Sequence, residues 1–264
     1  MSVAMPNTAT LIIPAYNEER RLDVARFLDL SRAPALSLLF VDDGSTDDTA
    51  GVLRSLRERA DAKGGRVEVM RAAKNGGKGE AVRLGMMRAL EHGAKIVGYA
   101  DADLSTPPEE LLRLRDEIAA EGVQVVTAAR VALIGRDIKR RATRHYLGRI
   151  FATVASTILG APFYDTQCGA KYFRASPLLE EALRVPFRSR WAFDVELIGR
   201  LLAGTPRQAP LTRADFLEVP LFRWEDVGGS KLKASGMLRA ATDLGGIAMD
   251  LAARRNARQL RPLG

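Results

Sequence analysis

Residues 96–108 read IVGYADADLSTPP, a short apolar run followed by two aspartates and then by two prolines. The apolar run Ile96–Ala100 is typical of a buried β-strand. The prolines favour the first turn of a helix, which the pattern extends over 107–120. The sequence therefore predicts a strand and a helix joined by a loop that carries Asp101 and Asp103.

The same alternation of strand and helix is repeated along the first half of the chain. Further strands are predicted at Thr10–Ile13, Leu36–Val41, Val67–Met70 and Val123–Thr127. Helices are predicted from about Glu18 with Asn17 as N-cap, from about Ser45 in a capping-box-like pair with Asp48, and over Lys78–His92. This alternation indicates an α/β fold with a mostly parallel, doubly wound sheet, in which ligands bind at the carboxyl ends of the strands.

The second half of the chain is less regular, and no linker or internal repeat divides it from the first. We expect an amphipathic helix over 139–159, a Cys- and Gly-containing segment over 165–174, a helix over 194–202, a strand over 216–222 and a C-terminal helix over 237–258. Residues 1–264 are therefore expected to form a single domain.

The composition is that of a globular protein, with 47% apolar and 27% charged residues. The single cysteine, Cys168, excludes an internal disulfide and fits a reducing compartment. We interpret its thiol as a packing group, because neither His92 nor His145 has an evident link to it. The N-terminus does not have the pattern of a signal peptide, and no run approaches the roughly 20 apolar residues of a membrane-spanning helix.

The net charge of +8 is concentrated in two segments. Residues 130–149 carry seven basic residues against Asp137 alone, and residues 231–264 carry seven against two aspartates. Such concentration indicates an anionic partner, which could be phosphate groups, a membrane surface or nucleic acid. Neither segment has the interleaved aromatic residues of a base-stacking surface, so nucleic acid is not expected as a partner.

Three of the predicted strands end in polar residues that folding alone does not require: Pro14–Glu18, Asp42–Ser45 and Asp101–Ser105. In a parallel sheet these ends meet at one edge, where clustered carboxylates oppose one another's ionisation unless a cation is present. Asp101 and Asp103 supply the hard oxygen ligands that Mg²⁺ or Mn²⁺ prefers, with positions left for a diphosphate. Two loop or helix-capping aspartates are the alternative, and the other two strand ends favour the metal site.

Seven runs of sequence follow one another in a distinctive order: PAYNEE, VDDGSTDDT, KNGGKGEAVRLGM, YADADLSTPPEEL, YDTQCGAKYFR, RWAFDVELI and VGGSKL. Together they lie within about residues 9–240 and resemble the family 2 glycosyltransferases of the nucleotide-diphospho-sugar type. The last three are similar to the dolichyl-phosphate (polyprenyl-phosphate) β-glucosyltransferases, close to the dolichyl-phosphate mannose synthases. The resemblance implies a GT-A fold, with a nucleotide-sugar-binding half at about 9–127 and an acceptor-binding half at about 128–264.

On the donor side, the resemblance implies that the base and ribose are held by Pro14, Ala15, Tyr16 and Glu18. Asp43 matches the aspartate that contacts the base, and Asp42 supports its loop. Lys78 is expected near the nucleotide in the Gly-rich turn 75–79, and such a turn at the start of a helix is itself a ready anion site. Helix capping by the two aspartates and Ser45, and an ordinary turn at 75–79, are the structural alternatives.

Asp101 and Asp103 match the metal-binding Asp-x-Asp motif of the family, with Ala102 between them beside the donor. The cofactor that the resemblance implies is Mg²⁺ or Mn²⁺. The mannose synthases often have a Gln two residues beyond the second aspartate, where it can complete the metal site. This chain has Ser105 there, as is expected of the glucosyltransferase branch, so the third protein ligand stays open.

Downstream, Arg130 matches an arginine near the phosphates, and Gln167 lies in a segment, 165–169, that matches the one lining the sugar and acceptor side in the family. The resemblance implies that Lys231 lies in a Gly-rich loop that folds over the diphosphate, where its charge would offset that of the departing UDP. Asp194 matches the position where many family 2 enzymes place a catalytic base, which a hydroxyl acceptor needs. A phosphate acceptor is already ionised, so Asp194 would then position the sugar or a basic partner. Helix capping is the structural alternative for Asp194.

The segment 139–159 has a basic first half and an apolar second half. Such a helix can lie in a bilayer interface, with Arg141 and Arg144 on lipid phosphates and Phe151 and Ile158 in the acyl boundary. Its arginines would then bind the acceptor. A helix packed on the core with a solvated basic face is the alternative.

We therefore expect a metal-dependent, inverting glycosyltransferase that moves a hexose, with glucose favoured, from a UDP-sugar such as UDP-glucose to a polyprenyl phosphate. It would act as a peripheral protein on the cytoplasmic face of the membrane. Mannose, galactose or an aminosugar, and a GDP donor, remain open at this point. The alternative functions are transfer to a soluble hydroxyl acceptor with Asp194 as base, and nucleotide-sugar binding without catalysis.

Overall fold

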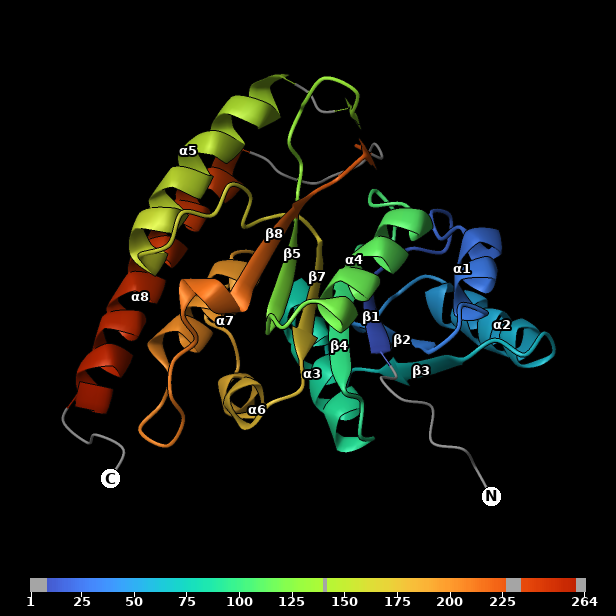
Figure 1. Ribbon diagram of the computed structural model, residues 1–264. Helices are drawn as coiled ribbons and strands as arrows, with labels where there is room; N and C mark the ends of the chain where they lie inside the picture. Colours follow the sequence, from blue (N-terminus) through green and yellow to red (C-terminus); the bar gives the residue numbers. More distant parts are fainter. Residues whose placement is uncertain (1–8, 140–141, 227–233, 260–264) are drawn as a thin grey trace.

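The structure, a computed structural model, describes residues 9–139, 142–226 and 234–259. Its centre is a seven-stranded sheet in the order β3-β2-β1-β4-β7-β5-β8 (Figure 1). The strands are β1 (Ala9–Ala15), β2 (Leu36–Asp42), β3 (Val67–Arg71), β4 (Ile96–Ala100), β5 (Val125–Ala129), β7 (Ala170–Arg174) and β8 (Phe216–Pro220). All but β7 run parallel, and β7 lies antiparallel between β4 and β5. The predicted α/β fold with a mostly parallel, doubly wound sheet is therefore confirmed.

Helices cover both faces of this sheet (Figure 1). They are α1 (Val24–Ser31), α2 (Thr49–Asp61), α3 (Lys78–Glu91), α4 (Pro108–Ala120), α5 (Ala142–Leu159), α6 (Pro177–Arg184), α7 (Phe193–Ala203) and α8 (Ala234–Gln259). One apolar core lies between the sheet and α1, α2 and α4, and another lies between the sheet and α3, α6 and α7. Along β1, Leu11 and Ile13 face the first core and Ile12 faces the second, as the two-residue period of a strand requires.

Helices α5 and α8 form a further layer beside α7, where they lie side by side in yellow-green and red in Figure 1. Leu159 of α5, Ile198 of α7 and Ile247 of α8 are among the residues of a third apolar core. A short parallel pair, β6 (Asp137–Lys139) and β9 (Arg223–Glu225), lies outside the main sheet. The predicted amphipathic helix, α5, and the predicted C-terminal helix, α8, thus share one apolar core with α7.

Two predicted helix starts are wrong, because the polar residues concerned order loops. The first helix begins at Val24 with Asp23 as its N-cap, and the predicted cap Asn17 has a left-handed φ of 54°. The second helix begins at Thr49, four residues after the predicted start at Ser45. The structure also places β5 two residues later than the sequence pattern does.

The sequence patterns do not predict β7, α6, β6 or β9. Strand β7 has the sequence AKYFR, in which the buried Lys171 interrupts an otherwise apolar run. Strands β6 and β9 have three residues each, too few for a periodic pattern. The antiparallel strand between β4 and β5 is therefore a feature of the tertiary structure that strand–helix alternation does not indicate.

Candidate active site

The loops after β1 and β2 are fastened together at the carboxyl edge of the sheet. Asn17 N donates to Ser45 Oγ (3.0 Å), and Glu18 N donates to Thr49 Oγ1 (2.8 Å). The Asn17 side chain in turn accepts from Thr46 N (2.9 Å). These hydroxyls therefore order the neighbouring loop, and Ser45 does not cap a helix.

Asp43 and Arg190 hold the Gly-rich turn from two sides. The buried Asp43 carboxylate accepts from Gly76 N (2.8 Å) and Gly77 N (2.7 Å). Arg190, which precedes α7, donates to the carbonyls of Asn75 (2.7 Å) and Gly76 (2.9 Å). Gly77 has a φ of 88°, and a Cβ there would lie 3.1 Å from the Arg190 side chain. The anion bound by the amides of Gly76 and Gly77 is thus the protein's own carboxylate, where the sequence indicated an open anion site.

Two cations of the chain lie beside the Asp-x-Asp motif. Lys78 Nζ is 2.5 Å from Asp101 Oδ1, and Arg21 Nη2 is 3.4 Å from Asp103 Oδ2. Burial acts to lower the pKa of Lys78, but the charge of Asp101 and of other nearby carboxylates outweighs it, so the pKa is raised. Lys78 therefore stays protonated and offsets the negative charge of the motif.

The two aspartates fit a divalent cation by their chemistry. Burial and the charge of Asp101 raise the pKa of Asp103, against the hydrogen bonds from Ser105 and the charge of Arg21. A cation between the carboxylates would relieve this repulsion. Ser105 Oγ donates to Asp103 Oδ1 (2.6 Å), so that oxygen already has a partner. Within the described part of the chain, no group of three or more Asp, Glu, His or Cys side chains is arranged to hold a metal.

Asp194 is buried in a polar cluster near this motif. Its Oδ1 accepts from Lys171 Nζ (2.7 Å) and from the Tyr99 hydroxyl. Lys171 is fully buried and also donates to Cys168 O (2.6 Å). Burial and the charge of Asp194 raise the pKa of Tyr99 well above its ordinary value, so the phenol stays protonated. Sequence reasoning missed Tyr99 and Lys171, although a lysine within an apolar run was an available signal.

The segment that carries YDTQCG is fixed by Arg130 and Glu218. Arg130 Nε and Nη2 donate to the Asp165 carboxylate at 2.6 and 2.8 Å. Burial lowers the pKa of Arg130, and the charge of Asp165 more than offsets this, so the guanidinium stays charged. Glu218 of β8 accepts from Tyr164 N and Asp165 N, each at 2.8 Å. Gln167 Nε2 on this segment is buried, with no hydrogen-bond partner among the residues that the structure describes.

The other predicted site residues lie at this edge or outside the described part of the chain. The residues predicted to hold the nucleotide include Pro14 and Ala15 at the end of β1, the exposed Tyr16 and the buried Ala102. Glu18 Oε1 lies 3.5 Å from Arg21 Nη1. Arg141 and Lys231 lie outside the described residues, and Arg144 lies in α5 without a described side chain.

Helix α5 exposes a different apolar face from the one predicted. Phe151 packs edge-on against Trp191 with ring centroids 5.1 Å apart, and Ile158 packs on the core shared by α5, α7 and α8. Among the side chains of α5 that the structure describes, the exposed large apolar ones are Ile150 (65% exposed) and Val154 (45%). The predicted placement of Phe151 and Ile158 in an acyl boundary is therefore wrong. None of the helices in the described ranges is both long and apolar enough to cross a membrane.

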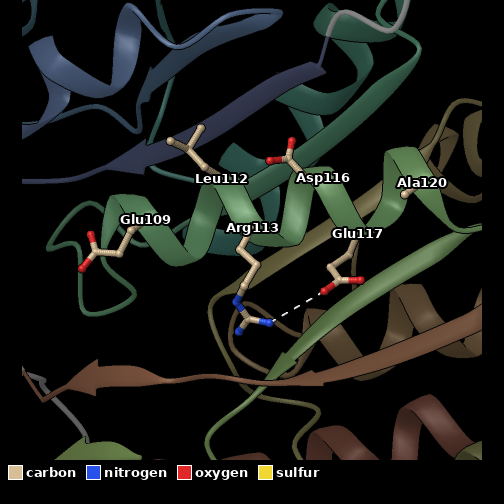
Figure 2. A pocket seen from close by; sticks show the side chains of 6 residues that line it. All are labelled: Glu109, Leu112, Arg113, Asp116, Glu117 and Ala120. Atoms are coloured by element: carbon tan, nitrogen blue, oxygen red, sulfur yellow. Dashed lines mark ion pairs between the residues drawn. The ribbon is translucent and has the colours of Figure 1, made fainter.

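A cavity of about 510 Å³ lies along α4 and contains none of the predicted site residues. Figure 2 shows its lining: Glu109, Leu112, Arg113, Asp116, Glu117 and Ala120. Arg113 Nη1 lies 3.9 Å from Glu117 Oε1. Of the acidic lining residues, Glu117 pairs with Arg113, while Glu109 and Asp116 pair with Arg223 and Arg115 outside the lining. The candidate site therefore remains the carboxyl edge of the sheet.

The fold and the charged strand ends agree with the GT-A fold that the sequence resemblance implies. The family model described as glycosyl transferase family 2 matches residues 10–181, which is more than half of the chain. The chain therefore belongs to glycosyl transferase family 2, and the resemblance seen in the sequence is confirmed.

Among curated proteins, the chain is similar to a dolichyl-phosphate beta-glucosyltransferase of Trichomonas vaginalis, with 32% identity over 91% of this chain and 70% of that protein. It is 29% identical to the polyprenol monophosphomannose synthase of Mycolicibacterium smegmatis, over 89% of this chain and 85% of that protein. Among solved structures, it is similar to the glucosyl-3-phosphoglycerate synthase of Mycobacterium tuberculosis in complex with Mn²⁺, uridine diphosphate and glucosyl-3-phosphoglycerate. The TM-score is 0.56 at 21% identity, over 98% of this chain and 82% of that one, which is a likeness of fold.

Proposed function

We propose that the protein transfers glucose from UDP-glucose to a polyprenyl phosphate, with Mg²⁺ or Mn²⁺ as cofactor. The observation that carries this proposal is the similarity to a dolichyl-phosphate beta-glucosyltransferase over most of both chains. The donor is supported by a structural neighbour that contains Mn²⁺ and uridine diphosphate. The pairing of Asp101 with Lys78 adds the charged groups that a diphosphate donor and a cation need.

The reaction is a single in-line displacement. A phosphate oxygen of the acceptor forms a bond to the anomeric carbon of glucose while the bond from that carbon to UDP breaks. The electron pair of the broken bond leaves with UDP, and the configuration at the anomeric carbon inverts. The acceptor phosphate is ionised near neutral pH, so this step needs no general base.

The chain's own residues serve the departing UDP and the sugar. Asp101 and Asp103 would hold the cation. A cation bound there would offset the negative charge that develops on the leaving diphosphate. Lys78 adds a positive charge beside Asp101. Two nitrogens of Arg130 donate to Asp165. Arg130 therefore fixes the YDTQCG segment and keeps its positive charge beside that segment. Lys231 is proposed for the leaving group from the sequence alone.

Asp194 is a weaker candidate for a general base than the sequence indicated. It is 3% exposed, and its Oδ1 receives hydrogen bonds from both Lys171 and Tyr99. An oxygen that already accepts two hydrogen bonds in a nearly closed environment is poorly placed to take a proton from an acceptor hydroxyl. This environment supports the phosphate acceptor over a soluble hydroxyl acceptor, and it supports a positioning role for Asp194.

A lipid acceptor requires contact with a membrane surface. Leu133 and Ile134 are exposed in the loop between β5 and β6, and Ile150 and Val154 are exposed on α5. These apolar side chains, together with the basic residues of 130–149, suit an interfacial position on anionic lipid. A peripheral place on the cytoplasmic face, and a single domain with a donor half and an acceptor half, complete the proposal.

The test is release of UDP from UDP-glucose with Mg²⁺ or Mn²⁺, with and without a short-chain polyprenyl phosphate in detergent. We expect release that depends on the lipid and produces a chloroform-soluble glucoside. Turnover only with soluble hydroxyl acceptors would contradict the lipid acceptor. Binding of UDP-glucose without any release of UDP would contradict the enzyme.

A further inference from the structure

A row of four polar side chains crosses the sheet at the candidate site. Strands β4, β7, β5 and β8 are neighbours (Figure 1). Their register pairs Tyr99 with Lys171, Lys171 with Thr127, and Thr127 with Glu218. Side chains paired in this way share one face of a sheet. We call Tyr99, Lys171, Thr127 and Glu218 the polar row.

Two members of the polar row, Glu218 and Lys171, bind the YDTQCG segment near its two ends. Glu218 accepts from the successive N–H groups of Tyr164 and Asp165, each at 2.8 Å. Lys171 Nζ donates to Cys168 O at 2.6 Å. The backbone of this segment is thus held at its start and near its end by two charged side chains of the sheet.

Burying charged side chains in a sheet costs desolvation free energy that apolar side chains do not cost. A buried ion pair loses its hydration, and apolar residues of similar size in its place are often neutral or stabilising. Lys171 is fully buried and Asp194 nearly so, and they form such a pair at 2.7 Å. On the same strand, Phe173 packs in an apolar core. Stability alone is therefore a weak reason for a lysine at position 171.

The segment that the polar row holds forms a wall beside Asp101. A Cβ at position 169 would overlap Asp101 Oδ2, so the Asp101 carboxylate can occupy this position because residue 169 is a glycine. Thr166 Oγ1 and Gln167 Nε2 are buried and lack a hydrogen-bond partner among the described residues. An unsatisfied buried donor or acceptor is unfavourable, so these two groups need a partner that the described residues do not supply.

We propose that Lys171 and Glu218 are positioning residues, which hold the YDTQCG segment so that Thr166 and Gln167 bind hydroxyl groups of the donor sugar beside Asp101. This inference rests on the proposed function for the identity of the donor. The base and ribose are expected at the loops after β1 and β2, whereas the segment lies against Asp101 through Gly169. Loosening the segment is therefore expected to misplace the sugar more than the base and ribose, so that kcat falls further than UDP affinity.

Lys171→Met tests the inference, because methionine keeps most of the side-chain volume without the donor group. We expect kcat for transfer to fall about 100-fold, as for a misplacement of about 1 Å. The Kd for UDP in the presence of Mn²⁺ is expected to change much less than kcat. Thr127→Val is the matched control: it lies in the same row, and its hydroxyl has no hydrogen-bond partner in the described ranges. Its kcat and Kd are expected to equal those of the wild type.

If Lys171→Met does not fold, Glu218→Gln tests the inference in its place. The amide oxygen of the glutamine still accepts a hydrogen bond from one of the two N–H groups. We expect its kcat to fall about 10-fold, the loss of roughly one hydrogen bond. Wild-type kcat in a folded variant, or an equal loss of kcat and UDP affinity, would overturn the inference. If the wild type transfers glucose only to a soluble acceptor, the proposed function fails. The ratios of the variants to the wild type on that acceptor then still test the polar row.

Discussion

At the scale of single residues, the charges of the candidate site are paired with one another. Asp101 has Lys78, Asp103 has Arg21, and Asp165 has Arg130. The sequence predicts that carboxylates gather at this edge, because residue type and strand position suffice for that. It does not predict the pairs, because each joins residues far apart in the chain.

Asp103→Ala is expected to abolish transfer. The remaining Asp101 cannot hold the cation alone against competing water, and we expect kcat to fall by about 1,000-fold or more. The measurement is UDP release at saturating Mn²⁺, with Asp116→Ala, a change at an exposed carboxylate on α4, as control. Wild-type turnover of Asp103→Ala at saturating Mn²⁺ would contradict the assignment of the metal site.

Cys168 is expected to resist thiol reagents in the folded protein. It is fully buried, and burial raises the pKa of its thiol to about 11, with Asp165 adding to this and Arg130 opposing it. At pH 8 the reactive thiolate is therefore scarce and shielded. Labelling with a maleimide should be slow in buffer and complete in denaturant. Rapid stoichiometric labelling of the native protein would show that Cys168 is a reactive group and not a packing residue.

At the scale of elements, the loops and turns differ most from what the sequence predicts. Asn17 and Ser45 have the composition of helix caps, but they bind each other's loops. Asp43 was assigned to the base by resemblance, and its oxygens bind the turn at Gly76 and Gly77. The sequence predicts the long helices well, because the apolar face of a helix follows from the spacing of residues within that helix. Loop contacts depend on which strands are neighbours, and local sequence patterns do not indicate this.

The clamp on the Gly-rich turn gives a prediction for Arg190. Arg190→Ala removes the hydrogen bonds to the carbonyls of Asn75 and Gly76, and the turn that positions Lys78 loosens. We expect KM for UDP-glucose to rise about 10-fold with a smaller change in kcat. Steady-state kinetics at varied donor concentration measure this, with Arg32→Ala at an exposed ion pair as control. An unchanged KM would show that the clamp does not affect donor binding.

At the scale of the whole molecule, the sequence predicts the layered sheet but not how the second half of the chain completes it. Strand β7 enters the sheet between β4 and β5 in the opposite direction and carries Lys171. The amphipathic helix was predicted, but its buried face was not, because α7 and α8 pack on the side that holds Phe151 and Ile158. Tertiary partners therefore decide which apolar face is left for a membrane.

The membrane surface gives a prediction for the loop between β5 and β6. Ile134 is fully exposed there, and lipid would cover it if this loop meets the bilayer. Ile134→Asp is expected to weaken binding to anionic vesicles about 10-fold, the loss of one buried aliphatic side chain. The control is Val185→Asp, at an exposed apolar residue that follows α6. Equal binding by the wild type and Ile134→Asp in a sedimentation assay would contradict this surface.

The central claim is that glucose passes from UDP-glucose to a lipid phosphate at this site. It is tested most directly with UDP-glucose labelled in the sugar, a polyprenyl phosphate and Mn²⁺, followed by extraction into chloroform. We predict labelled glucosyl lipid with the wild type, and none with Asp103→Ala or after chelation of the metal. An unlabelled organic phase with the folded wild type, while label appears in a water-soluble glucoside, would contradict the account.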